Sequence, residues 1–210
     1  EQHAYLAQMI IDEGIDDPRT CGQSVVQGSE KSVSGVSMRI EHDFDALQLT
    51  SITAFRQAEY DWVHELGGVD APPGLLAVVD NEGEESDQLS QEIRLSNTTD
   101  NMHWVLGAYA IQENVDRFAN VPITFASGLL LDRSWLQSAQ NTSKAVFGQI
   151  TFPLMDQLNL TLGGRQTWDD KDMDQLFKSS PTTVVYDLKD LSDSWSAFTG
   201  RATLDYKIDE

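Results

Sequence analysis

The chain has 210 residues, 40% of them hydrophobic, which is enough to build the core of one domain. It carries 34 acidic residues against 14 basic ones, a formal net charge of −20. This balance excludes a nucleic-acid partner, because a surface that binds phosphates needs a basic stripe, and it argues against simple adhesion to anionic lipid. The single cysteine, Cys21, excludes an intrachain disulfide and the common zinc signatures.

The sequence shows no segment typical of a membrane helix or of a secretory signal. No window holds about 18 uninterrupted apolar residues, the length that crosses a bilayer as a helix. Residues 1–14 lack the basic start and the long apolar core of a signal peptide. A chain of this kind would occupy a membrane only through β-strands, whose sequence signal is much weaker.

The first part of the chain predicts a loop-like segment followed by a hairpin. We expect residues 1–34 to form a segment that enters the fold. Alternating apolar and polar residues then predict a strand over 35–44, a tight turn at 45–46 and a second strand over 47–62. The stretch 67–83 is acidic and rich in Pro and Gly, which predicts a loop.

The middle of the chain repeats this pattern. Clean alternation over 89–96 predicts a third strand, and a turn at 97–101 leads to a fourth strand over 102–113. Residues 114–142 lack alternation and are expected to form a long connection.

The last part of the chain predicts three more strands. A fifth strand is expected over 144–152, followed by a tight turn at Pro153–Asp156 and a sixth strand over 157–168. A polar, Asp-rich loop is expected over 169–193. The seventh strand is expected over 195–206.

Two features of this layout predict the fold class. Short and long connections alternate, with long ones near 63–87, 114–143 and 169–193, as in up-and-down barrels of outer membranes. From the third segment on, one face is free of charge while the other holds charged residues, which suits lipid on one side and water or a plug on the other. We therefore expect an all-β, antiparallel up-and-down transmembrane β-barrel, as a fragment of about seven strands with long outer loops.

A second fold also fits the alternation. An antiparallel sandwich buries its apolar face in a core instead of in lipid. The chain would then be a soluble, acidic β-sandwich module that binds carbohydrate or mediates calcium-dependent adhesion. Asp170, Asp172 and Asp174 have the spacing of a calcium loop, but Gln175 and Pro181 stand where an EF-hand requires Gly and Glu. No metal site is assigned.

Several segments resemble, in order along the chain, the barrel of TonB-dependent receptors. They are Leu49–Arg56, Asp87–Ser96 with His103–Tyr109, Ser143–Gln149 with Leu158–Arg165, and Trp195–Arg201 with Leu204–Lys207. The resemblance covers roughly residues 33–210. Barrels of this family have about 22 strands around an N-terminal plug. The sequence shows no plug domain, so we expect residues 35–210 to be a partial barrel.

The resemblance implies transport rather than catalysis. We expect part of a receptor in the outer membrane of a Gram-negative bacterium that imports a scarce nutrient: a ferric siderophore first, otherwise cobalamin or an oligosaccharide. The expected partners are outer-membrane lipid, a small-molecule or metal-chelate substrate, and the TonB complex, acting through the missing plug domain. No cofactor is expected, and no catalytic constellation is present in the sequence.

Two groups of residues are candidates for binding. Charged residues on the expected lumen face would form salt bridges between neighbouring strands, or contact a plug or an anionic substrate. They are Arg39, Glu92, Arg94, Arg165 and Arg201. Residues at or in the outer loops would stack on a ligand. They are Trp62, His64, Phe125 and Trp135.

Overall fold

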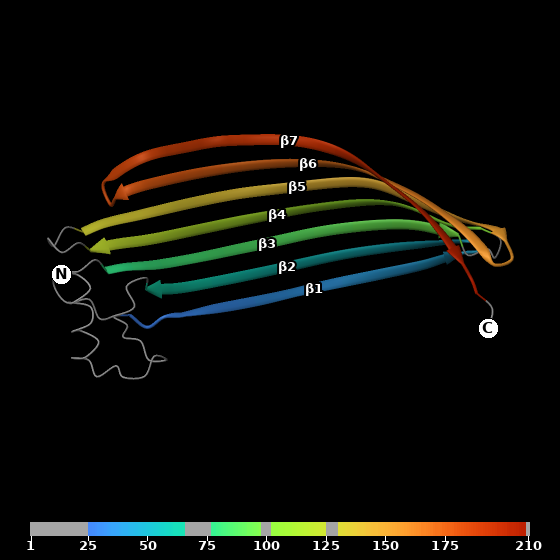
Figure 1. The fold of residues 1–210 in the computed structure, drawn as a ribbon, viewed down its shortest axis with the longest axis horizontal. Helices are drawn as coiled ribbons and strands as arrows, with labels where there is room; N and C mark the ends of the chain where they lie inside the picture. Colours follow the sequence, from blue (N-terminus) through green and yellow to red (C-terminus); the bar gives the residue numbers. More distant parts are fainter. Residues whose placement is uncertain (1–24, 66–76, 98–101, 125–129, 209–210) are drawn as a thin grey trace.

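The computed structural model of the protein describes residues 25–65, 77–97, 102–124 and 130–208, and nearly all of them lie in seven β-strands. The strands are β1 (Gly28–Phe44), β2 (Leu47–Glu65), β3 (Ala77–Asn97), β4 (His103–Thr124), β5 (Leu130–Met155), β6 (Leu158–Ser180) and β7 (Thr183–Tyr206). Each strand pairs antiparallel with the next, and together they form one sheet (Figure 1). The all-β, up-and-down architecture expected from the sequence is confirmed.

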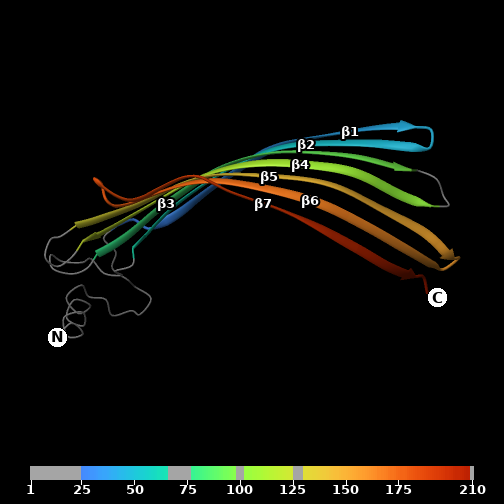
Figure 2. The ribbon, with the colours of Figure 1, turned by 90° about the horizontal axis from the view of Figure 1, so that it is seen from above.

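The sheet is long, twisted and open. Figure 2 shows that the strands rotate relative to one another, which is the twist that L-residues impose on extended chains. β1 and β7 form its two edges. Because the described residues form one sheet with no second sheet against it, the alternative of a two-sheet sandwich is wrong for this part of the chain.

Apart from β2, which is expected over 47–62, the strands are much longer than the alternation predicts. They contain 17 to 26 residues, whereas a strand that crosses a membrane needs about 9–11. β1 begins at Gly28, inside the expected loop-like segment 1–34, whose first 24 residues lie outside the described ranges. β5 continues to Met155, so the turn before β6 is at 156–157 rather than at Pro153–Asp156.

The expected long outer loops are mostly strand. Residues 114–142 belong largely to β4 and β5, and residues 169–193 continue β6 and β7 as far as a turn at Pro181 and Thr182. Where both faces of a sheet meet water, the alternation of apolar and polar residues disappears although backbone pairing continues. Sequence patterning therefore predicts loops for most of the residues beyond the alternating segments, although it assigns 57–62 to a strand. We use the name far extension for residues 57–65, 77–87, 114–124, 130–140, 172–180 and 183–192.

Between the far extension and the opposite, short-turn end, one face of the sheet carries a continuous apolar band. The strand register places large apolar side chains of all seven strands on this face, which we call the apolar face. They include Met38, Ile40, Leu49, Phe55, Leu89, Ile93, Leu106, Val146, Ile150, Leu162, Phe198 and Leu204. Many are strongly exposed, with Leu106 at 58% and Phe198 at 71%. A continuous exposed apolar surface of this kind suits contact with lipid.

The opposite face, which we call the polar face, is the better covered of the two. Of the buried side chains in the described ranges, Thr50, Ala119, Ala145 and Thr161 lie on it, whereas Glu65 lies on the apolar face at the end of β2. Charged, hydroxyl and amide side chains dominate it within the band. Nowhere in the described ranges is there a helix with the length and apolar character needed to span a bilayer.

Candidate functional site on the polar face

The sheet brings all five charged candidates onto the polar face. Arg39 and Glu92 lie in one register row, Arg94 and Arg165 in the next row, and Arg201 in the row after that. Successive rows on one face are about 7 Å apart along a strand. The five side chains therefore occupy one zone of the face, nearer the short-turn end than the far extension.

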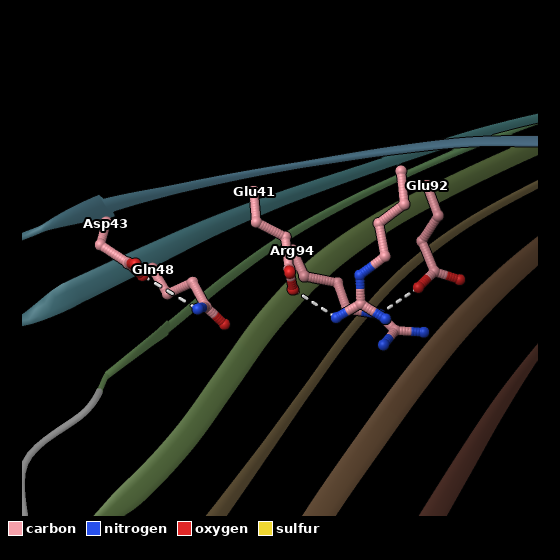
Figure 3. A network of polar contacts seen from close by, with 6 residues as sticks. Glu41, Asp43, Gln48, Glu92 and Arg94 are labelled. Atoms are coloured by element: carbon pink, nitrogen blue, oxygen red, sulfur yellow. Dashed lines mark hydrogen bonds and ion pairs between the residues drawn. The ribbon is translucent and has the colours of Figure 1, made fainter.

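Two of these arginines are paired along their own strands. Arg39 pairs with Glu41, and Arg94 pairs with Glu92, each partner standing two residues away. Figure 3 shows Arg94 pointing toward Glu92, with the Glu41 carboxylate turned toward the same place. These two pairs run along a strand rather than between neighbouring strands, and the positions opposite each arginine carry no carboxylate.

Arg165 and Arg201 have no carboxylate partner among the described residues. Arg165 donates to the Oγ1 atom of Thr167 at 3.1 Å. Its guanidinium lies over the rings of Tyr109 and Phe147, at 5.6 and 5.8 Å from their centroids. Arg201 donates to a threonine hydroxyl two residues away, at 3.0 Å. Each guanidinium keeps further donors that a carboxylate or another anionic group would accept from.

The ring beneath Arg165 depends on a glycine. Gly107 is the register partner of Phe147, and the ring lies across its backbone. A Cβ atom at Gly107 would sit 2.3 Å from the Cζ atom of that ring, so a larger residue would displace it. This use of a strand glycine, to admit an aromatic ring from the next strand, keeps the ring flat on the sheet.

An aromatic row crosses the far extension of the polar face. One register row runs through Trp62, Glu82, Ala119, Trp135, Phe177 and Tyr186. The rings of Trp135 and Phe177 are stacked with centroids 4.7 Å apart, and those of Phe177 and Tyr186 are 5.4 Å apart. We call the four aromatic members Trp62, Trp135, Phe177 and Tyr186 the aromatic row. Trp62 is separated from the other three rings by Glu82 and by Ala119, which contributes only a methyl group. We call this gap in the row of rings the step.

A charged pair lies inside this step. Glu82 on β3 and Arg117 on β4 form an ion pair between the strands. The hydrogen bond to Glu82 raises the pKa of Arg117, so the pair stays ionised.

Beside Trp62 lies a pair of polar atoms without partners. Trp62 stacks on His64 at 5.3 Å, and His64 stands opposite Asp80 in the register. The Nδ1 atom of His64 and the Oδ1 atom of Asp80 are buried, and neither has a hydrogen-bond partner within the described part of the chain. Burial raises the pKa of Asp80, Glu82 adds to this effect, and His64 and then Arg117 oppose it. Such unsatisfied atoms are uncommon in folded proteins.

The candidates expected in outer loops are in strands. Trp62 and His64 belong to β2 and Trp135 to β5, because pairing continues beyond the apolar band. The register nonetheless places Trp62 and Trp135 in one row. Phe125 lies outside the described residues.

Two members of the aromatic row are missing from the expectations based on sequence. Phe177 and Tyr186 fall in the segment expected to be a polar loop. A signal for them exists: Val184 and Val185 precede Tyr186, and residues of this kind on both sides of Pro181 favour a hairpin. Within the described ranges, no three His, Cys, Asp or Glu side chains stand where they could hold a metal ion.

These features define a class of protein. One up-and-down antiparallel sheet, with strands at least as long as a bilayer is thick, carries an exposed apolar band on one face and charged side chains on the other. That combination is the wall of an outer-membrane β-barrel.

The sequence model of the TonB dependent receptor-like β-barrel family matches residues 14–210, and the chain belongs to this family. It is a family of outer-membrane receptors rather than of enzymes. No match was found among curated proteins.

Solved structures of two such receptors have the same fold. The ferric yersiniabactin uptake receptor FyuA from Yersinia pestis is 15% identical, with a TM-score of 0.66 over 89% of this chain and 28% of its own. The ferric-catecholate import receptor Fiu from E. coli K12 is 13% identical, with a TM-score of 0.64 over 90% of this chain and 32% of its own. The chain thus spans about a third of each receptor.

Proposed function

We propose that the chain is part of a receptor in the outer membrane of a Gram-negative bacterium that imports a ferric siderophore. The family membership supports this proposal, as do the two receptors of like fold, which take up ferric yersiniabactin and ferric catecholates. The energy would come from the TonB complex, acting through a plug domain that the strands described here do not include. The outer-membrane lipid would contact the apolar face.

In this account the polar face lines the barrel interior. The five charged candidates, Arg39, Glu92, Arg94, Arg165 and Arg201, would then face the plug or the passing chelate. The far extension would stand outside the bilayer, because the strands exceed the membrane thickness in that direction.

The aromatic row carries the proposal. Its stacked rings at Trp135 and Phe177 lie on the interior side of the far extension, where a substrate would arrive first. Siderophore chelating groups are often planar rings, and aromatic stacking contributes about 0.5–1.5 kcal/mol per pair beyond area burial. Trp62 and His64, whose rings are stacked, would contact the same ligand from the other side of the step.

Uptake of a radioiron-labelled ferric catecholate by cells that express the full-length receptor tests this proposal. We expect Trp135→Ala and Phe177→Ala each to raise the half-saturating substrate concentration by about threefold to tenfold, because one stacking partner is lost. Tyr206→Ala, an aromatic residue on the other face at the short-turn end, serves as the matched control. Uptake that is the same in all three variants and in the wild type would show that the aromatic row does not bind the substrate.

A further inference from the structure

A second exposed apolar patch lies on the apolar face, outside the lipid band. One register row of the far extension runs through Gly83, Phe118, Leu136 and Leu176. Phe118 is 39% exposed and Leu136 is 46% exposed. Exposed apolar side chains that neither lipid nor a core covers mark a contact surface. We call Phe118, Leu136 and Leu176 the outer apolar row.

Polar side chains separate this row from the band. Asn114 donates to Asp87 at 3.0 Å, and Gln140 donates to Asn114 at 2.9 Å, which forms a hydrogen-bonded chain across β3, β4 and β5. The outer apolar row is therefore a patch of its own rather than the upper margin of the lipid band.

The patch is preformed. The ring of Phe118 lies across Gly83 on the neighbouring strand, where a Cβ atom would be 2.3 Å from the ring Cε1 atom. Leu136 stands between Phe118 and Leu176 in the register. Three adjacent strands lie about 10 Å apart from first to last, so the row offers an apolar strip of that width.

Carboxylates surround the strip without matching cations. Glu59, Asp61, Glu85 and Asp116 line the same hollow, whose volume is about 430 Å³, and no ion pair engages them in the described part of the chain. Two cations line the hollow, and both are engaged elsewhere: Arg117 pairs with Glu82, and Lys189 is shared by Asp174 and Asp187, at 3.3 and 3.6 Å. The hollow therefore combines an apolar floor with an excess of negative charge.

We propose that this hollow is a docking site for a cationic, amphipathic polypeptide segment. Its apolar side chains would cover the outer apolar row, and its Lys or Arg side chains would reach the neighbouring row of carboxylates, about 7 Å away along the strands. A divalent cation alone would use the carboxylates and leave the apolar strip exposed. The face is the one opposite the aromatic row, so this partner is distinct from the imported substrate.

Fluorescence anisotropy with the full-length receptor in nanodiscs tests the proposal. The probes are a labelled peptide of alternating Lys and Leu, and a second peptide in which Ser replaces Leu. We expect saturable binding of the Lys–Leu peptide, a dissociation constant raised about tenfold or more by Leu136→Asn and by Asp116→Asn, and weaker binding at high salt. Gly83→Ala should also weaken binding, because it displaces the Phe118 ring.

Matched controls on the polar face separate this site from general effects. Leu188→Asn changes a leucine with 41% exposure, and Glu113→Gln removes one carboxylate; neither should alter peptide binding. Equal binding of both peptides with no effect of Leu136→Asn would overturn the proposal in favour of unspecific charge attraction. The proposal would also be overturned if calcium bound in a way that depends on Asp116 and the Lys–Leu peptide did not compete with it. Siderophore uptake is measured alongside, and Leu136→Asn should leave it unchanged, so each proposal fails independently of the other.

Discussion

At the scale of single residues, glycines fix the positions of the aromatic rings. Gly107 admits Phe147, which lies beneath Arg165, and Gly83 admits Phe118 on the other face. Neither glycine has a positive φ in the described structure, so space rather than backbone conformation explains them. Their roles follow from the register, which pairs each glycine with its ring.

Gly107→Ala should destabilise the barrel, whereas Gly148→Ala should be tolerated. The added methyl at Gly107 would meet the Phe147 ring at 2.3 Å, while a methyl at Gly148 would find its nearest neighbours at 3.5 Å. Overpacking of this kind costs about 1–3 kcal/mol. Urea unfolding of the full-length receptor in lipid vesicles measures the difference between these two neighbouring sites. Equal free energies of unfolding for the two variants would refute the role given to Gly107.

Asp80 gives the far extension a pH dependence. Its pKa is raised above the ordinary value, chiefly by burial, so the folded state holds the proton more readily than the unfolded state does. The strands around it should therefore become more stable as the pH falls through the raised pKa, and less stable above it. Asp80→Asn should slow the hydrogen exchange of residues 77–87 at neutral pH and remove this local pH dependence. A variant that exchanges faster than the wild type at neutral pH would contradict the assignment.

At the scale of strands, the sequence predicts the strand segments within the apolar band, but it does not predict most of their continuation into the far extension. Apolar residues such as Ile93, Leu106 and Leu162 recur at every second position because one face meets lipid. This alternation allows all seven strands to be predicted. It also places Arg39, Arg94 and Arg201 on one shared face. Beyond the band both faces meet water. Phe177 and Tyr186 then stand in segments without a clear period, and the register shows that they share a row with Trp135.

The far extension of β6 and β7 should behave as a strand pair in solution. In hydrogen-exchange measurements on the full-length receptor in detergent, the amides of residues 172–180 and 183–192 should exchange much more slowly than those of an open loop, because they pair across the hairpin. The register shift beside Asp190, which has a φ of 55°, should be the local exception. Loop-like exchange throughout both segments would show that the hairpin ends near residue 169.

At the scale of the whole molecule, the two faces of the sheet carry different kinds of surface. The polar face carries the five charged candidates and the aromatic row, and the apolar face carries the lipid band with the acidic hollow beyond it. This division also explains how a chain with a net charge of −20 enters a membrane. Among the described residues, most carboxylates lie on the polar face or in the far extension, and the lipid band is nearly free of them.

The most direct test of this account is nitroxide scanning along β4 in lipid vesicles. Single cysteines at positions 103–106 and 108–110 of the full-length receptor, in a Cys21→Ser background, would be spin-labelled; Gly107 is left unchanged because a side chain there would displace the Phe147 ring. The labels would be exposed to oxygen, which concentrates in lipid, and to a water-soluble nickel chelate. Labels at 104, 106, 108 and 110 should collide mainly with oxygen, and labels at 103, 105 and 109 should not share this preference. Equal access at neighbouring positions, or a period other than two, would contradict the assignment of this sheet to a barrel wall.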